Sequence, residues 1–257
     1  MKIGLLCNFY GFPHYTARVL EAWKNIPEIS TVAVSSYKYQ DYADCGWDID
    51  DTETPIQLLT EHREFVDYIS TGKNANDSSS RNAALFNILD NHDVDCVWLL
   101  DQDEFYSEED IKKTLKYLAS ASPKSPTYRI NFKNFVFSEN QYIEDFTAPR
   151  IFGVNVNGLK TLNHFYYEND VNYAINGEIV DYKRLGIRDI PKAVCFPNHY
   201  SWIGPPQFLK AKVNYQLKRY NGICSYKWNE KKRQLEFNED FYAMTNQKIP
   251  NVKIHKK

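Results

Sequence analysis

The stretch Cys96-Val97-Trp98-Leu99-Leu100-Asp101-Gln102-Asp103-Glu104-Phe105 decides the fold. Its first half is a short apolar run, which is typical of a strand buried on both faces in the parallel sheet of an α/β domain. Its second half places two carboxylates, Asp101 and Asp103, directly after that strand. Open α/β sheets bind their ligands beyond the carboxyl ends of their strands. The stretch therefore predicts both a buried central strand and a binding site at its end.

The two carboxylates also indicate the chemistry of that site. Clustered carboxylates bind hard divalent cations such as Mg²⁺ or Mn²⁺, which in turn hold the oxygens of a diphosphate. Asp101 and Asp103 therefore favour a metal-assisted site for a phosphate-containing substrate. The alternative is a turn or a helix cap, because Asp and Glu are common before helices. An EF-hand loop starting at Asp101 is excluded, since Phe105, Tyr106 and Lys112 stand where a ligand, a Gly and a Glu are needed.

The composition is that of an ordinary globular protein. The chain has 257 residues, 43% of them hydrophobic, and a formal net charge of −2, which argues against a nucleic-acid scaffold. The five cysteines form no C-x-x-C pair, and an odd count favours reduced thiols in a cytosol-like compartment. No apolar stretch approaches the roughly 20 residues that span a bilayer. We therefore expect a soluble, cytoplasmic protein.

Strands and helices alternate along the first hundred residues, which predicts βαβ units and a parallel sheet. Residues 39–60 are polar and acidic, and predict a long loop or a short irregular helix. The predicted strands are Lys2–Cys7, Thr31–Tyr37, Phe65–Ile69 and Asp95–Leu100, and the predicted helices are Tyr15–Lys24 and Ser79–Asn91.

The second half of the chain is mixed rather than a regular βαβ series. Ser107 is a predicted helix N-cap, with Asp110 three residues on. Further predicted elements are a strand at Tyr128–Phe137, short strands within Phe146–Asp181, a strand at Val194–Phe196, and a helix that opens at Gly204-Pro205-Pro206 and ends near Tyr220. The predicted fold class is α/β, with a Rossmann-like βαβ N-terminal half, a mixed central sheet and helices on both faces.

Several motifs together resemble a known family. Ser80-Arg81-Asn82, a helix, a buried strand and then Asp101-x-Asp103 resemble the nucleotide-binding half of family 2-like glycosyltransferases with the GT-A fold. The longer motif ending in Glu104-Phe105 is similar to a subgroup with an Asp-x-Asp-Glu-Phe motif. Two later segments, Pro149-Arg150-Ile151-Phe152 and Asn198-His199-Tyr200-Ser201-Trp202, also resemble segments of that subgroup.

The resemblance implies an organisation for the chain. Residues 1–225 would form a single GT-A-like domain, with a nucleotide-binding half at 1–105 and an acceptor half at 106–225. Residues 226–257 match nothing in the family, and we expect a C-terminal extension packed on the same domain.

The resemblance also implies the site. Asn8, Arg81, Asp101 and Asp103 would bind the nucleotide, and Asp101, Asp103 and His199 would bind Mn²⁺ or Mg²⁺. From the residues alone, Arg81 could pair with a phosphate or lock the acidic loop through a bidentate contact. His199 suits Mn²⁺, and its alternative is a hydrogen-bonded structural histidine beside Pro197.

The implied reaction is transfer of a sugar from a nucleoside-diphosphate sugar, with a UDP-sugar as first choice, to the hydroxyl of a glycan or other acceptor. The family implies inversion, which needs a carboxylate base. Glu178 is the first candidate base, with Asp181 and Asp170 behind it. The chain departs from the family pattern at Ser35-Ser36, where an acid would follow the second strand.

Two other functions stay open. A protein with a degenerate site would bind a nucleotide or carbohydrate without turnover. A nucleotidyltransferase shares a similar sheet, but should carry a Gly-rich first turn. The first turn of this chain, Asn8-Phe9-Tyr10-Gly11-Phe12-Pro13, holds one Gly and argues against that class.

Overall fold

A computed structural model describes most of the chain. The described residues are 1–11, 13–48, 53–121, 125, 127–156, 159–162, 164–165, 173–175, 178–180, 186–219, 221–222, 224, 226–237 and 255–256.

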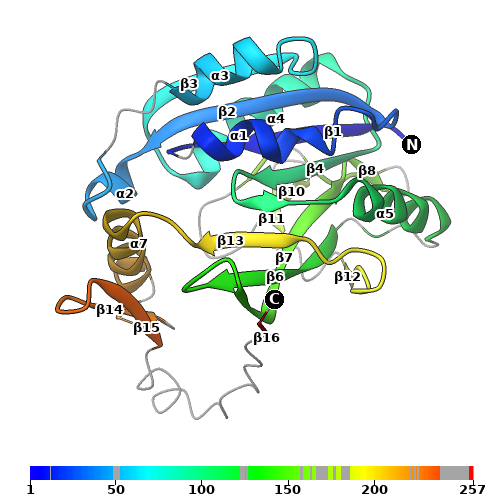
Figure 1. Ribbon diagram of the computed structural model, residues 1–257. Helices are drawn as coiled ribbons and strands as arrows, with labels where there is room; N and C mark the ends of the chain where they lie inside the picture. The colour runs from blue at the N-terminus through cyan, green and yellow to red at the C-terminus, as the bar shows by residue number, and fades with distance from the viewer. Residues whose placement is uncertain are drawn as a thin grey trace.

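The N-terminal half forms the parallel part of a ten-stranded mixed sheet (Figure 1). Its strands lie in the order β3-β2-β1-β4, and all of their pairings are parallel. The predicted βαβ half is therefore confirmed. Its elements are β1 (Ile3–Asn8), α1 (Pro13–Glu21), β2 (Ile29–Tyr39), β3 (Tyr68–Ala75), α4 (Asp77–Asn91) and β4 (Cys96–Asp101).

The second half continues the same sheet with antiparallel pairings. β7 runs antiparallel to both β4 and β6, and β13 then pairs parallel to β6 and antiparallel to the two-residue β5. The mixed central sheet is thus confirmed. The bounds are β5 (Glu104–Phe105), β6 (Thr127–Val136), β7 (Gln141–Gly153), β12 (Ile187–Asp189), β13 (Asn198–Trp202) and β16 (His255–Lys256), of which β12 pairs with β6 and β16 with β7.

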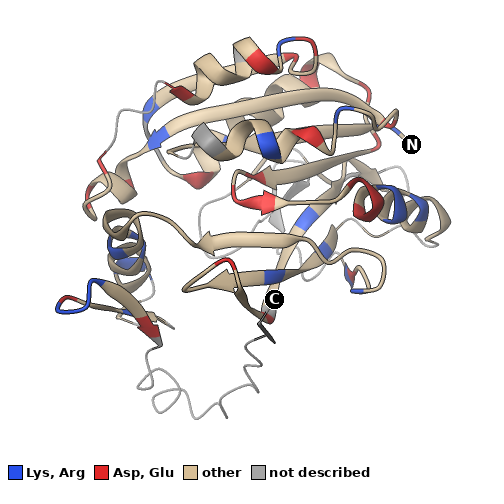
Figure 2. Cartoon of the chain, viewed as in Figure 1, with Lys and Arg blue, Asp and Glu red and all other residues tan. Residues whose placement is uncertain are grey.

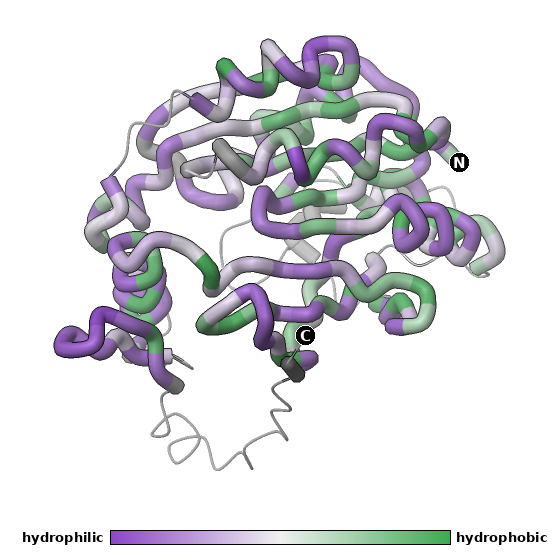
Figure 3. Tube along the Cα trace, in the orientation of Figure 1, coloured by the Kyte–Doolittle hydropathy of each residue, from purple (hydrophilic) through white to green (hydrophobic). Residues whose placement is uncertain are grey.

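Both faces of the parallel strands are buried under helices. Leu5 and Trp98 face one core cluster with α1 and α5 (Glu108–Ser120), whereas their neighbours Leu6 and Leu99 face a second cluster with α4. Successive residues of a strand point to opposite faces, which explains why β1 and β4 are without polar side chains up to their last residues, Asn8 and Asp101. Figure 3 shows the hydrophobic segments along these central strands and a mostly hydrophilic β14–β15 hairpin.

The remaining elements lie around the sheet. α7 (Pro206–Arg219) contacts α2 (Gln40–Ala43), and it also contacts the hairpin of β14 and β15 (Figure 1). The hairpin strands are β14 (Tyr226–Asn229) and β15 (Gln234–Phe237). The other elements are α3 (Glu53–Glu61), β8 (Asn155–Val156), β9 (Leu159–Lys160), β10 (Tyr173–Ile175) and β11 (Glu178–Val180).

Two local predictions were wrong. Val194–Phe196 is not a strand; the strand begins after Pro197, at Asn198. The third strand is Tyr68–Ala75 and not Phe65–Ile69.

The other two segments agree with their predictions. Residues 146–181 hold short strands, β8 to β11, after the end of the longer β7, and Pro149 of β7 sits where the pairing with β6 shifts register, a position that tolerates a missing N–H. Of the two alternatives for residues 39–60, a loop or a short helix, the structure has short helices, α2 and α3.

Candidate active site

The site lies at the point where the strand order reverses. From β1 the chain passes through α1 to β2 on one side, and it returns from β3 through α4 to β4 on the other side of β1. Asn8 and Asp101, the last residues of β1 and β4, are register partners. Crevices between two such strand ends are the usual ligand sites of open α/β sheets.

A cleft of about 430 Å³ opens at these strand ends. Its size suits a small-molecule ligand. It is lined by the ends of β1, β4, β6 and β13 and by residues of α2, α4 and α7. All five residues predicted to bind nucleotide or metal line this cleft, namely Asn8, Arg81, Asp101, Asp103 and His199.

Asp101 is held by two guanidinium groups. Nη2 of Arg81 donates to both of its oxygens at 3.1 and 3.3 Å, and Nη2 of Arg150 donates to Oδ2 at 2.9 Å. Burial alone would raise the pKa of Asp101, but the charges of Arg81 and Arg150 outweigh it and lower the pKa to about 2. Asp101 is therefore ionised and its charge is compensated. Of the two sequence interpretations of Arg81, the locked acidic loop is the one present in this structure.

Arg150 and Glu104 form the inner part of the same network. The Glu104 side chain is fully buried, and its Oε1 accepts from Nε of Arg150 at 2.7 Å. Burial raises the pKa of Glu104 to about 8, although the charge of Arg150 opposes the shift. Sequence reasoning gave neither residue a role, because 46 positions separate them. The Glu-Phe ending of the motif and the Pro-Arg segment were the only signals.

Asp103 faces His199 across the cleft. Nε2 of His199 lies 3.6 Å from Oδ1 of Asp103, and Nδ1 lies 3.0 Å from the amide oxygen of Asn134. Burial lowers the pKa of His199 to about 4, even though Asp103 opposes the shift. The imidazole is therefore neutral near pH 7. Because Asn134 presents its oxygen, Nδ1 donates and Nε2 is left with its electron pair toward the carboxylate.

The pair of Asp103 and His199 fits a cation. Two electron-pair donors that face each other at 3.6 Å repel unless a proton or a metal ion lies between them. Metal-binding histidines commonly donate their second ring N–H to an oxygen acceptor, as His199 does to Asn134. Within the described part of the chain there is no group of three or more His, Cys, Asp or Glu side chains that could hold a metal. A role for Asp101 as a metal ligand stays a prediction.

Asn8 is part of a buried polar cluster. Its Oδ1 accepts from the hydroxyls of Tyr39 at 2.5 Å, Ser80 at 3.0 Å and Ser35 at 3.2 Å. Ser35 therefore lies inside β2, within the predicted strand Thr31–Tyr37, and its hydroxyl is bonded to the end of β1. Its hydroxyl and that of Ser80 tie β2 and α4 to the end of β1.

The side chain of Gln102 anchors the acidic loop to the first turn and to α1. Only 4% of this residue is exposed; its Oε1 accepts from the backbone N–H of Tyr10 at 2.7 Å, and its amide donates to Thr16 at 2.8 Å. The middle residue of the Asp-x-Asp motif thus connects the end of β4 to the first turn and α1. Sequence reasoning missed this role, since a single Gln carries no pattern.

The far wall of the cleft is aromatic. The Tyr42 ring stacks on Tyr215 with centroids 4.6 Å apart, and Trp47 packs edge-on against Phe208 at 5.3 Å. These contacts join α2 and the segment after it to α7. Of this wall, the sequence predicted only the helix that opens at Gly204-Pro205-Pro206.

The described residues do not place any of the candidate catalytic bases in the cleft. Glu178 is the first residue of β11, where it pairs with Ile175, and its side chain is outside the description. Asp181 and Asp170 lie outside the described residues altogether. Their roles stay predictions.

No model of a known protein family matches the sequence, and no curated protein matches it. Among solved structures, the chain is similar to S. aureus TarS 1–349 in complex with UDP-GlcNAc, at 18% identity and a TM-score of 0.39; the similarity covers 55% of this chain and 39% of that one. This chain therefore spans well under half of that TarS structure.

Two further solved structures belong to other enzymes. Glucosyl-3-phosphoglycerate synthase from Mycobacterium tuberculosis, in complex with Mn²⁺, UDP-glucose and glycerol 3-phosphate, is 10% identical with a TM-score of 0.48, over 92% of this chain and 86% of that one. A CMP:2-keto-3-deoxy-manno-octonic acid synthetase complexed with CTP is 13% identical with a TM-score of 0.36, over 61% and 73% of the two chains. At these values the similarity concerns the course of the chain alone. No described helix is long and apolar enough to cross a membrane.

Proposed function

We propose that this protein is a metal-dependent glycosyltransferase that moves a sugar from a nucleoside-diphosphate sugar to an acceptor hydroxyl. The observation that carries the proposal is the convergence of the Asp103 carboxylate and Nε2 of a neutral His199 at 3.6 Å. They lie in a cleft at the reversal point of the sheet, where α/β folds bind nucleotides. The sequence motif that resembles family 2-like glycosyltransferases supports the same assignment.

The residues of the cleft have distinct proposed roles. Asp103 and His199 would hold Mn²⁺ or Mg²⁺, which supplies Lewis-acid neutralisation of a departing diphosphate. Asn8 and Arg81, at the ends of β1 and α4, would contact the nucleotide. Glu178 is the proposed base for the acceptor proton, with Asp181 as the second choice.

The experiment measures release of UDP from UDP-sugars with and without Mn²⁺, and thermal stabilisation by UDP under the same conditions. Asp103→Asn removes the carboxylate charge while keeping its shape, and we expect at least a 100-fold loss of turnover. Asp93→Asn is the matched control, because the side chain of Asp93 is 95% exposed and pairs only with Lys2 in the described chain. A ligand that binds the native state stabilises it by mass action, so UDP with Mn²⁺ should raise the melting temperature of the protein.

The outcomes separate the alternatives. Full turnover in excess chelator would remove the metal from the proposal. Binding of UDP with Mn²⁺, but no UDP release with any sugar donor and acceptor, would favour a non-catalytic binding protein. Release of pyrophosphate from a nucleoside triphosphate and a sugar would favour a nucleotidyltransferase.

A further inference from the structure

Lys212 presents a buried positive charge at the wall of the cleft. It belongs to α7 and is 9% exposed, and it lines the cleft together with Asp103 and Ser201. Its Nζ donates to the backbone oxygen of Ser201 at 2.7 Å and contacts the Ser201 hydroxyl. The same ammonium lies 5.1 Å from the ring centroid of Trp202 and 5.5 Å from that of Phe208.

The partners of this ammonium are all neutral. In the described part of the chain, no carboxylate lies within ion-pair distance of Lys212, whereas Arg81 and Arg150 are both paired with acids. The nearby Lys210, on the same helix, is about half exposed and pairs with Glu230 at 2.6 Å. A buried charge without a counter-ion destabilises the folded protein unless a ligand compensates the charge. Burial accordingly lowers the pKa of Lys212, although Asp103, Asp101 and Asp77 oppose the shift.

We propose that Lys212 binds a phosphate oxygen of the ligand in the cleft. An ammonium has three donors, and the two contacts to Ser201 leave one for a ligand. A compact, strongly hydrated cation suits a phosphate oxygen, and the aromatic rings beside it keep the group in place. This site does not need a metal ion, which separates it from Asp103 and His199.

The phosphate has two possible sources, and the identification of either rests on the proposed function. The first is the diphosphate of the nucleotide donor, and the second is a phosphate carried by the acceptor. Lys212 and Asp103 line the same cleft, so the lysine and the proposed metal ligand belong to one site.

The test is calorimetric titration of pyrophosphate, in excess chelator, into the wild-type chain and into variants. Lys212→Met removes the ammonium, and Lys212→Gln removes the charge while keeping a donor for Ser201. We expect pyrophosphate to bind about 10- to 100-fold more weakly to both, as the loss of a charged hydrogen bond implies. Lys212→Arg should keep most of the affinity.

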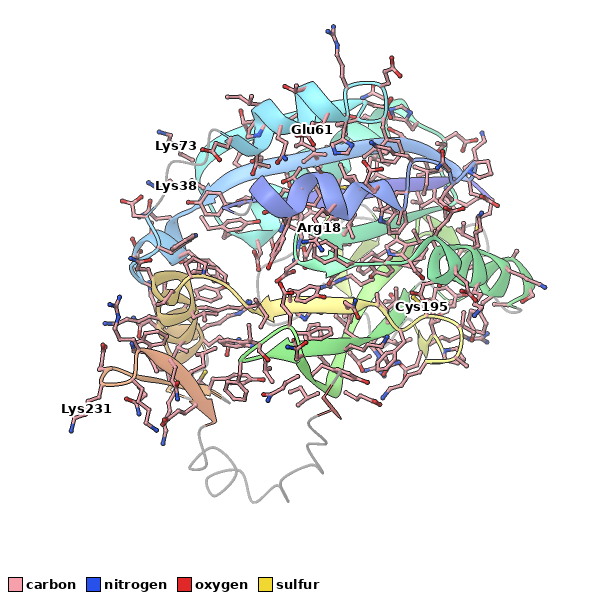
Figure 4. The ribbon with its side chains drawn as sticks, viewed as in Figure 1. Arg18, Lys38, Glu61, Lys73, Cys195 and Lys231 are labelled. Atoms are coloured by element: carbon pink, nitrogen blue, oxygen red, sulfur yellow. The ribbon has the colours of Figure 1, made fainter. Side chains whose placement is uncertain are left out.

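Matched controls come from two exposed lysines. Lys210→Met changes the same helix, and Lys231→Met changes the tip of the β14–β15 hairpin, where the side chain points away from the molecule (Figure 4). Figure 2 shows that basic residues gather on α7 and this hairpin, so these controls separate a specific contact from the general positive field. Both controls should bind pyrophosphate as the wild type does. Circular dichroism of each variant checks its fold, and Lys212→Gln decides the matter if Lys212→Met does not fold.

Competition identifies the source. If UDP displaces pyrophosphate and loses affinity by the same factor in the Lys212 variants, the phosphate is that of the donor. If the two ligands bind together, the phosphate belongs to the acceptor. Wild-type affinity for pyrophosphate in both Lys212→Met and Lys212→Gln, or no binding by the wild type, would overturn the inference. Lys212-dependent pyrophosphate binding in a protein that neither binds UDP with Mn²⁺ nor releases it would leave this inference standing and remove the proposed function.

Discussion

Replacement of Arg150 by Met should destabilise the protein by about 3 kcal/mol, at the lower end of the cost of breaking a buried ion pair. The guanidinium is 8% exposed and donates to Glu104 at 2.7 Å and to Asp101 at 2.9 Å. Asp101 keeps Arg81 in the variant, so its charge stays compensated. Glu104 loses a cation that lowers its pKa, and because burial has already raised this pKa to about 8, the acid stays neutral in the variant, which keeps the cost at the lower end of that range.

The same reasoning predicts how a second substitution behaves. Glu104→Leu in the Arg150→Met background removes the stranded acid, and the double variant should be more stable than the sum of the two single effects predicts by about 1–3 kcal/mol. Urea unfolding followed by tryptophan fluorescence measures the free energy of unfolding of all four proteins. The m-values must agree, because a changed m-value would signal a changed native or denatured state. Additivity within about 0.5 kcal/mol would refute the coupling, and a single-variant cost below about 1 kcal/mol would refute the buried network itself.

Three further predictions concern Asp101 and two positions in the elements around the site, Asn76 and Gly72. The pKa of Asp101 is lowered from 3.8 to about 2 in the folded protein. Its ionised form therefore contributes about 2 kcal/mol to the free energy of unfolding above pH 4, and this contribution is lost as the pH falls toward 2. Acid unfolding of Asp101→Asn should lack that part of the pH dependence. The side chain of Asn76 accepts from the N–H of Ser79 at 2.8 Å and caps α4, so Asn76→Ala should lower the free energy of unfolding by about 1 kcal/mol, and Asn76→Asp should retain it. A Cβ at Gly72 would overlap the ring of Tyr37. Gly72→Ala should therefore lower the free energy of unfolding, measured by chemical denaturation, by about 1–3 kcal/mol, and by much less when Tyr37 is also replaced by Ala.

The parallel half of the fold could be predicted from the sequence because its signals are local. β1 and β4 carry no polar side chain before their last residues, Asn8 and Asp101, and that pattern occurs where helices cover both faces of a strand. The capping box of Ser107 and Asp110 was visible for the same reason, since both residues belong to one turn. Predicted boundaries differ from the observed ones by a few residues at most for these elements.

The second half was harder because its strands depend on distant partners. β13 is polar along Asn198-His199-Tyr200-Ser201, yet it forms a strand because β6 supplies parallel partners and β5 antiparallel ones. Its apolar neighbours at 194–196 form a turn instead. Nothing in the order of residues shows which strand will lie beside β6. The hairpin of β14 and β15 was missed for a related reason, since it rests on a small separate cluster with Trp202 and Val213.

The candidate site shows the same division between local and distant information. From the last residue of β4 onward, burial alternates: Gln102 and Glu104 are 4% and 0% exposed, whereas the more exposed Asp101 and Asp103 line the cleft. The acidic motif therefore predicts which two carboxylates line the cleft. It does not predict their charge state, because that depends on residues brought from elsewhere in the chain.

Those distant residues give the two acids different chemistry. Asp101 is neutralised by Arg81 and Arg150, so the negative charge it could offer a cation is already in use. Asp103 faces only a neutral His199 among its ion-pair partners in the described chain, and so it keeps its charge for a cation. Lys212, in the same cleft, has no carboxylate partner in the described chain and keeps its positive charge for an anion. A ligand that satisfies both must bring a metal ion and an anionic oxygen together, and a metal–diphosphate complex does so, which is why the residual charges of the cleft favour a nucleoside-diphosphate donor over a neutral sugar.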